Sequence, residues 1–269
     1  MTTAEKRRVT AIVPTFNEAA NIVDCLRSLQ WADEILVVDS FSTDGTAGLA
    51  RKLGARVIEH EYGNSAAQKN WTIPQAAHEY IFLVDADERC TPELAAEVRA
   101  LLASGGPLMD GYWIYRRNFF LGKEIRHSGW NTDKVIRLFR RGLRYQELTV
   151  HAEVDVPSGK TGVLKGRFIH YTLDSLDQFF EKRQRYADWA AVDLDRRGRR
   201  GGALAALVHG VGNFAKMYLL RLGFLDGTHG FMLALLFSYY TAAKYVRLWE
   251  RQLPPNPRLG IRNQGAAGK

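Results

Sequence analysis

The chain has 269 residues, of which 46% are hydrophobic and 25% charged, and its 37 basic and 29 acidic side chains give a formal net charge of +8. These values exclude disordered, collagen-like and coiled-coil classes, and the length suits one large α/β domain, alone or with an appendage. Two cysteines, Cys25 and Cys90, are too few for a disulfide framework or a structural zinc site and predict reduced thiols. Residues 1–8 lack the apolar core of a signal peptide, so we expect a cytoplasmic chain.

Strand and helix signals alternate over the first hundred residues. Short apolar runs predict strands at 9–14, 34–39, 55–60 and 80–85. The segments between them predict helices at 17–30, 43–54, 65–77 and from 91 onward. Asn17 and Thr91 are candidate helix caps, and Pro74 is expected to kink or end the third helix. Strands alternating with helices imply a mostly parallel sheet covered on both faces, with ligands beyond the carboxyl ends of its strands.

The second half of the chain has a different pattern. Strands are predicted at 111–119 and 134–139, followed by a long polar helix at 173–195. An arginine cluster comes next, formed by Arg196, Arg197, Arg199 and Arg200. Apolar stretches at 203–215 and 230–243 are each shorter than the roughly 20 residues that a membrane-spanning helix needs. The expected parts are a domain at 1–170, a helical region at 171–253 and a flexible tail at 254–269.

Charge is unevenly distributed along the chain. Residues 1–100 carry 10 basic and 15 acidic side chains, net −5, whereas residues 101–269 carry 27 and 14, net +13. A basic half favours a polyanionic partner or an anionic membrane surface, although a solvated basic face would look the same. Aromatic residues around Lys244, Arg247 and Arg251 favour a helix that lies in the membrane interface. Packing on the first domain, or in a dimer interface, is the alternative.

The sharpest motif is Asp85-Ala86-Asp87, which directly follows an apolar strand. Side chains alternate along a strand, so the two carboxylates can point the same way. At that spacing they can hold a divalent cation, which can bridge a diphosphate. An acid pair that caps a helix is the structural alternative, but the position after the fourth strand favours the cation site.

Polar residues also follow the first two strands. The turn after the first strand begins with Pro14 and offers three polar side chains, those of Thr15, Asn17 and Glu18. Asp39 ends the second strand, where a carboxylate can accept hydrogen bonds from a ribose or a base, or can cap the next helix. Next to Gln68, Lys69 is a candidate to neutralise a phosphate, with a solvated lysine as the alternative.

Several common motifs are absent from the sequence. No Gly-x-Gly-x-x-Gly follows the first strand, and the chain has no P-loop, no Gly-x-Ser-x-Gly and no His-Glu-x-x-His. A nicotinamide-binding Rossmann site, a P-loop nucleotide triphosphatase, an α/β hydrolase and a zinc protease are therefore not predicted.

Together these segments resemble the family 2 glycosyltransferases, which have the GT-A fold. The resemblance rests on residues 12–18 and 37–46 and on Asp85-Ala86-Asp87. Further segments resemble the lipopolysaccharide core β-glucosyltransferase subgroup, namely 68–70, 85–88, 128–133, 137–139, 150–151, 169–171 and 224–231. The resemblance covers about residues 8–250. The chain departs from the subgroup at one point. Ala152 separates His151 from Glu153, whereas the subgroup usually has glutamate directly after this histidine.

The resemblance implies a GT-A-like α/β fold, with a mostly parallel sheet flanked by helices and a helical C-terminal appendage. It implies inverting transfer of a hexose from a nucleotide sugar, with UDP-glucose as the expected donor. Mg²⁺ or Mn²⁺ on Asp85 and Asp87 is expected to stabilise the leaving diphosphate. The residues expected around the donor are Pro14, Thr15, Asn17, Glu18, Asp39, Gln68, Lys69 and Asp85.

Transfer also needs a general base to take the proton of the acceptor hydroxyl. The resemblance favours Asp133, just ahead of an Arg-Leu segment, and then Glu153. Glu147 and His151 are further candidates, and His151 could instead complete the metal or diphosphate site. The structural alternative for Asp133 is a salt bridge with an arginine such as Arg137.

The acceptor implied by the resemblance is a hydroxyl of the lipopolysaccharide core or of a related envelope glycolipid. We therefore expect a peripheral protein on the inner face of the cell membrane, in contact with an anionic membrane surface and possible as a homo-oligomer. One alternative is a polyprenyl-phosphate glycosyltransferase. Another is a non-catalytic basic module that binds a membrane or nucleic acid, but the intact Asp85-Ala86-Asp87 disfavours it, and no nucleic-acid partner is expected.

Overall fold

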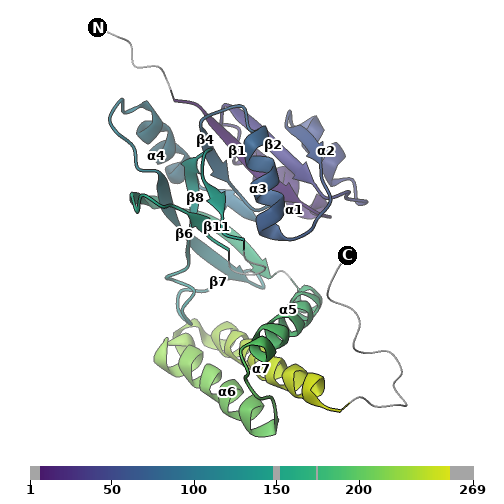
Figure 1. Ribbon diagram of the computed structural model, residues 1–269. Coiled ribbons are helices and arrows are strands. Elements are labelled where there is room, and N and C mark those ends of the chain that lie inside the picture. Colours follow the sequence, from purple (N-terminus) through teal and green to yellow (C-terminus); the bar gives the residue numbers. More distant parts are fainter. Residues whose placement is uncertain (1–6, 148–151, 174, 255–269) are drawn as a thin grey trace. The chain divides into compact units, whose positions relative to one another are not determined.

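Figure 1 shows the computed structural model of the chain, which describes residues 7–147, 152–173 and 175–254, apart from the side chains of residues 178 and 182. The chain forms two compact units, Met1–Asp174 and Ser175–Lys269. The first unit contains the sheet, and the second contains three long helices. Residues 255–269 of the expected tail lie outside the described residues.

The first unit is built on a nine-stranded sheet. Its strands are β1 (Val9–Thr15), β2 (Glu34–Asp39), β3 (Arg56–Glu59), β4 (Tyr80–Leu83), β5 (Glu88–Cys90), β6 (Gly111–Phe120), β7 (Lys123–Glu124), β8 (Lys134–Arg140) and β11 (Thr161–Leu173). The order across the sheet is β3-β2-β1-β4-β8-β6-β11-β5, with β7 paired to β6. Strands β5, β7 and β8 run against the others, so the sheet is mixed but mostly parallel, as predicted. Separately, β9 (Arg144–Tyr145) pairs with β10 (Val154–Asp155).

Helices cover both faces of this sheet. They are α1 (Ala19–Arg27), α2 (Thr46–Lys52), α3 (Ser65–Thr72) and α4 (Pro92–Ala103). Helices α1, α2 and α4 contribute to one apolar cluster, whereas α3 and the 3-10 turn Ile73–Gln75 contribute to a second. Right-handed crossovers keep successive helices on one face until the strand order reverses, so α3 changes face where the chain returns from β3 to β4. Ligands bind open α/β sheets at such a reversal, here between β1 and β4.

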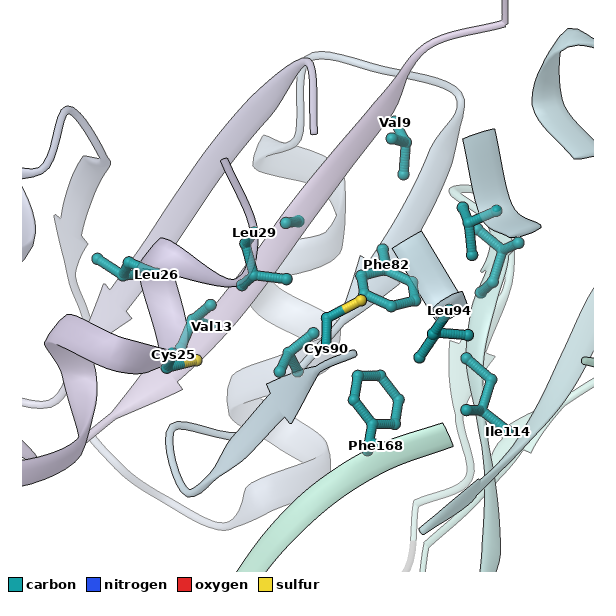
Figure 2. Close-up of a cluster of buried hydrophobic side chains, with 14 of the residues drawn as sticks. Val9, Val13, Cys25, Leu26, Leu29, Phe82, Cys90, Leu94, Ile114 and Phe168 are labelled. Carbon is teal, nitrogen blue, oxygen red and sulfur yellow. The ribbon is translucent and has the colours of Figure 1, made fainter. Parts of the chain in front are cut away.

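The larger apolar cluster lies between the sheet and helices α1, α2 and α4, and Figure 2 shows its centre. Phe82 of β4 is fully buried, and its ring lies 5.2 Å from that of Trp31 and 5.4 Å from that of Phe168 between centroids. Cys25 and Cys90 are buried in the same cluster and are free, as predicted. Burial raises the pKa of the Cys90 thiol to about 12, so this thiol is protonated and unreactive at neutral pH.

Strand β11 is the main element that the sequence pattern did not predict. Its 13 residues mix glycines with exposed polar side chains and lack a regular apolar alternation. The strand continues to Leu173, so the following helix begins at Leu176 rather than at residue 173 as expected. Pairing with β6 on one side and β5 on the other holds β11 inside the sheet, where its far end reaches the candidate site.

A bulge lets β11 dock on α4. The register against β6 shifts between Val163 and Arg167, and Glu97 of α4 accepts the backbone N–H groups of Lys165 and Gly166 at 2.8–3.0 Å. A Cβ atom on Gly166 would lie 2.4 Å from the Cα atom of Leu94, so only glycine permits this close approach.

Two of the three predicted helix boundaries are confirmed. Thr91 caps α4, with its hydroxyl accepting the Leu94 N–H at 3.3 Å, and Pro74 lies in the 3-10 turn that ends α3. Asn17 does not cap α1, which begins at Ala19. Its backbone is in the left-handed region, at φ 54°, and a helix N-cap needs the extended region.

The second unit consists of α5 (Leu176–Arg196), α6 (Ala203–Ala215) and α7 (Gly227–Gln252), and α7 packs against both other helices (Figure 1). A π-helical turn at Lys216–Leu220 extends α6. As a result, Ala203–Leu220 is long and apolar enough to cross a membrane, the one helix among the described residues that passes this test of length and composition. The sequence pattern ended this stretch at Ala215, five residues before the end of the helical segment.

Candidate active site

The loops after β1 and β2 are bound to each other at the carboxyl ends of these strands. The buried Asp39 carboxylate accepts hydrogen bonds from the Thr15 hydroxyl at 3.0 Å and from the Ser42 N–H and hydroxyl at 2.7 and 2.6 Å. Asn17 donates its backbone N–H to Ser42 Oγ at 2.8 Å, and its Oδ1 accepts the Thr43 N–H at 2.9 Å. These bonds fix a polar edge beside the reversal point of the sheet. Pro14 belongs to β1 itself, opposite Val38.

Asp44 supplies the α1 cap that Asn17 does not. Its carboxylate accepts the Ala19 N–H at 2.9 Å, and it also accepts the Thr46 N–H and hydroxyl at 3.0 and 2.5 Å. Glu18 joins the same contact, because its N–H donates to Thr46 Oγ1 at 2.8 Å. The predicted residues of the first turn therefore lie together, and one aspartate connects the starts of α1 and α2.

Helix α3 brings two buried polar side chains to this region. Gln68 donates to Ser40 Oγ at 2.5 Å, and Lys69 Nζ lies 3.0 Å from Asp85 Oδ1. Lys69 is therefore the partner of a carboxylate rather than a solvated lysine. The loops after β2 and β4 are joined through these two residues.

Strand β4 was predicted to end at Asp85 but ends at Leu83. Asp85 therefore lies in the short loop between β4 and β5. One carboxylate oxygen contacts Lys69, and the other contacts Arg137 of β8. Burial alone would raise the pKa of Asp85, but the charges of Arg137 and Lys69 outweigh it and hold this pKa well below its usual range. Both oxygens of Asp85 thus face cations.

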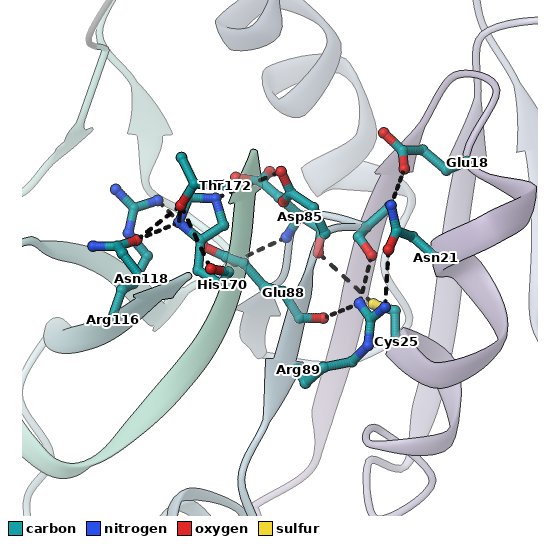
Figure 3. Close-up of polar contacts among 12 residues, drawn as sticks. Glu18, Asn21, Cys25, Asp85, Glu88, Arg89, Arg116, Asn118, His170 and Thr172 are labelled. Atoms are coloured by element: carbon teal, nitrogen blue, oxygen red, sulfur yellow. Dashed lines mark hydrogen bonds and ion pairs between the residues drawn. The ribbon is translucent and has the colours of Figure 1, made fainter. Parts of the chain in front are cut away.

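An ion-pair network continues from Asp85 through Glu88, as Figure 3 shows. Glu88 is fully buried on β5, accepts the Asp85 N–H at 3.0 Å, and lies 3.3 Å from both Arg116 and Arg137. Arg116 also donates two hydrogen bonds of 2.8 Å to the Asp133 carboxylate. Buried charges of this kind are stable only when every partner is present, so the network sets the positions of three strands and two loops.

Asp133 is held by three hydrogen bonds. Two come from Arg116 and one of 2.9 Å from Asn118 Nδ2. Burial alone would raise the pKa of Asp133, but the hydrogen bonds and charge of Arg116 outweigh it, and the pKa is lowered. A carboxylate with this environment has a reduced tendency to take a proton.

Asn118 fixes the orientation and tautomer of His170 on β11 (Figure 3). Its Nδ2 donates to Asp133 and to the Trp130 carbonyl, which leaves its Oδ1 as an acceptor. His170 Nδ1 lies 2.6 Å from that oxygen, so Nδ1 carries the proton and donates it. His170 Nε2 lies 3.5 Å from Asp87 Oδ2, and in the neutral imidazole it is the nitrogen that carries the lone pair. Asp87 and His170 therefore face each other with one oxygen atom and one nitrogen atom that could act as metal ligands.

Glu153 lies near the same cations. Burial raises the pKa of its carboxyl group, and the charges of Arg137, Arg116 and Lys69 oppose this shift without cancelling it. Glu147 is exposed, and His151 lies outside the described residues. Glu153 is thus a predicted base that combines partial burial with a raised pKa.

The structure thus brings most of the predicted residues that it describes to one edge of the sheet, and it adds residues that the motifs did not indicate. These are Glu88, Arg116, Asn118, Arg137 and His170. Three of them, Glu88, Arg137 and His170, lie in segments on which the family resemblance rested. The sequence therefore pointed to these positions but assigned them no role in the site. In the described part of the chain, no three His, Cys, Asp or Glu side chains converge to hold a metal ion by themselves.

Known proteins similar to this chain include glycosyltransferases. An uncharacterized glycosyltransferase of Rickettsia typhi is 26% identical over 90% of this chain and 86% of its own length. LpsC of Rhizobium meliloti, a lipopolysaccharide core biosynthesis glycosyltransferase, is 27% identical over 93% of this chain and 96% of its own length. The chain therefore aligns with these relatives over nearly its whole length.

Among solved structures, residues 1–349 of TarS from S. aureus give a TM-score of 0.47, with 17% identity over 96% of this chain and 93% of theirs. Glucosyl-3-phosphoglycerate synthase from Mycobacterium tuberculosis gives a TM-score of 0.36, with 20% identity over 42% and 44%. The family model described as Glycosyl transferase family 2 matches residues 10–162, more than half of the chain, from β1 into β11.

Proposed function

The chain belongs to glycosyl transferase family 2, and from this premise we propose that it transfers a hexose, with inversion, from a nucleoside diphosphate sugar to a hydroxyl of a lipopolysaccharide core or related envelope glycolipid. UDP-glucose is the proposed donor. The observation that carries the proposal is the facing pair of Asp87 and His170 beside the fixed polar edge at the strand reversal. The similarity to LpsC over 93% of the chain supports the acceptor class.

The nucleotide is proposed to bind along the edge formed by the loops after β1 and β2. Thr15 and Asp39 are held rigidly there, and the neighbouring Phe16 and Phe41 are each more than half exposed. Exposed aromatic side chains can stack on a base, while fixed polar groups can bind its edge or the ribose. Lys69 and Arg137 lie next to this edge, and each is paired with Asp85.

A divalent cation would be held by Asp87 and His170, since Asp85 already faces two cations. Nδ1 of His170 is bound to Asn118, so Nε2 is the ring nitrogen that faces Asp87 and that would bind a metal in the neutral imidazole; a hydrogen bond at the other ring nitrogen is typical of metal-binding histidines. A mixed oxygen and nitrogen pair suits Mn²⁺ better than Mg²⁺, which prefers oxygen alone. When bound, the cation would stabilise the negative charge on the leaving diphosphate.

Glu153 is the proposed general base. A base works best when its pKa lies near the working pH, and burial moves the pKa of Glu153 in that direction. Asp133 is moved the opposite way by Arg116, so we propose that it positions Arg116 and Asn118 instead. Glu153 would take the proton of the acceptor hydroxyl as that oxygen attacks the anomeric carbon on the face opposite the diphosphate.

A donor screen tests the proposed activity. Purified full-length chain with Mn²⁺ is expected to be stabilised by UDP-glucose more than by UDP-galactose, UDP-N-acetylglucosamine or GDP-mannose, and to hydrolyse it slowly without acceptor. A ligand at 100 times its dissociation constant contributes about 2.7 kcal/mol, which raises the melting temperature of a chain of this size by several degrees. If no nucleotide sugar stabilises the chain or is hydrolysed, the proposal fails.

The second unit is proposed to bind an anionic membrane surface. Leu204, Leu207, Val208 and Val211 follow helical spacing on α6, and each side chain is more than half exposed. The exposed arginines 196, 197, 199 and 200 directly precede this apolar face. An apolar helix face next to a basic cluster matches acyl chains below anionic headgroups, which favours a bilayer over a second copy of this basic chain.

Replacing these four arginines by serine is expected to weaken binding to vesicles of anionic lipid by at least about tenfold. Each basic side chain near an anionic bilayer contributes about 1 kcal/mol, and salt screens this attraction. Vesicle flotation at low and high salt measures the effect, and hydrolysis of the free donor should not change.

A matched control removes four exposed arginines from the first unit, namely Arg8, Arg27, Arg51 and Arg99. This control has the same net charge and should float like the wild type. Equal losses in both variants, or a wild type that never floats with anionic vesicles, would rule out membrane docking by this helix.

A further inference from the structure

A basic pocket of about 400 Å³ adjoins the candidate active site within the first unit. Its polar lining consists of Arg116, Arg117, Arg126 and Arg167 together with Glu124 and Asn131. Four guanidinium groups and one carboxylate line the pocket, and one of the four, that of Arg116, is also paired with Asp133 and Glu88. The pocket is formed by β6, β7, β11 and their loops, whereas the proposed donor edge is formed by β1, β2 and α3 on the other half of the sheet.

Glu124 balances only part of this charge. Arg117 donates to both of its oxygens at 2.9 and 3.0 Å, and Arg126 reaches one of them at 3.3 Å. Arg167 is exposed, and among the described residues it forms no ion pair. Its guanidinium lies 5.5 Å from the centroid of the Tyr115 ring. A guanidinium supported on a ring face keeps its in-plane donors for another ligand.

Arg116 connects the pocket with the candidate active site. The same guanidinium that lines the pocket binds Asp133 and Glu88. Asn131, also in the lining, is two residues from Asp133. A group bound in the pocket would therefore contact the guanidinium that holds Asp133, and Asp133 is linked through Asn118 to His170.

We propose that this pocket binds an oxyanion, a phosphate or carboxylate group carried by the acceptor sugar close to its reacting hydroxyl. The inference rests on the proposed glycosyl transfer and specifies the acceptor class of that reaction. Planar guanidinium groups match the paired oxygens of phosphate and carboxylate, and the volume lies in the range of pockets that hold small molecules. Anchoring the anion would orient the hydroxyl toward the donor.

Calorimetric titration of the full-length chain, saturated with UDP and Mn²⁺, tests this inference with three simple probes. Glucose 6-phosphate and glucuronate carry the two anions, and glucose is their neutral counterpart. At least one charged sugar is expected to bind at least tenfold more tightly than glucose, and the tighter one identifies the anion. Arg167→Gln should weaken that binding at least tenfold without changing the affinity for UDP, and Arg126→Gln should act in the same direction.

Lys165→Gln is the matched control, because Lys165 is exposed on the same strand but does not line the pocket. Its affinity for the charged sugars should stay within twofold of the wild type. Equal losses in the Arg167 and Lys165 variants, or inorganic phosphate binding as tightly as glucose 6-phosphate, would overturn the acceptor site. A chain that binds UDP but prefers no charged sugar refutes this inference alone, whereas a chain that binds no nucleotide refutes the proposed function.

Discussion

An Asp87→Asn variant is expected to lose glycosyl transfer by roughly 1,000-fold while it keeps its fold. The variant retains the shape of the side chain but removes the negative charge that faces His170 at 3.5 Å. A Lewis-acidic cation supplies several kcal/mol of transition-state stabilisation, and about 4 kcal/mol corresponds to that factor. Initial rates of transfer give the loss, and the melting temperature with and without Mn²⁺ shows whether the cation still strengthens UDP binding.

Two further aspartates separate metal binding from general effects of charge. Asp24→Asn changes an exposed residue of α1 and should leave both readouts unchanged. Asp85→Asn should lower the melting temperature even without ligand, because Lys69 and Arg137 lose their shared partner. Full transfer by Asp87→Asn, or undiminished transfer by the wild type in excess chelator, would remove the cation from the mechanism.

A Glu153→Gln variant is expected to lower turnover by roughly 100- to 10,000-fold, the usual contribution of a general base, with donor affinity unchanged. Asp133→Asn should have a much smaller effect on turnover, because its carboxylate is already held by Arg116 and Asn118. Single-turnover rates and UDP affinity, measured side by side, distinguish the two residues. Should Asp133→Asn prove inactive and Glu153→Gln active, Asp133 becomes the base.

The pH profile gives an independent measurement of the same residue. A general base must be deprotonated, and burial raises the pKa of Glu153. As the pH is lowered, wild-type activity should therefore begin to fall at a higher pH than the pKa of an ordinary glutamate would predict. This acidic limb should disappear from the residual activity of Glu153→Gln. Glu147→Gln, at an exposed position a few residues away, should keep both the limb and the rate. A limb that survives in Glu153→Gln would belong to another group.

Local sequence patterns were sufficient for most of the first hundred residues. Apolar runs such as Glu34–Asp39 matched their strand residue for residue, because a strand buried on both faces consists of consecutive apolar side chains. Thr91 and Pro74 marked helix ends because capping and proline chemistry act within one turn. The family resemblance rested on these same short segments, and the match over residues 10–162 confirms it.

Long-range contacts decided what local patterns left open. Strand β11 lacks a periodic signal and is stabilised by pairing with β6 and β5 and by its close approach to α4 at Gly166. Asn17 was predicted to cap α1, yet the Ala19 N–H at the start of this helix is capped by Asp44, 25 residues beyond Ala19. In both cases, the partner that satisfies the backbone is distant in sequence, so no window along the chain contains it.

By itself, the sequence determined the α/β class, the order of strands and helices from β1 to β4, and the edge of the sheet at which the polar motifs collect; it did not predict the short strand β5 before α4. The tertiary structure decided how each carboxylate at that edge is paired. Asp85 is paired with Arg137 and Lys69, and Asp133 is paired with Arg116. Asp87 faces His170. The chemical character of a carboxylate depends on the charges and hydrogen-bond donors within a few ångströms, and here separate strands and a helix bring those groups together only when the sheet forms.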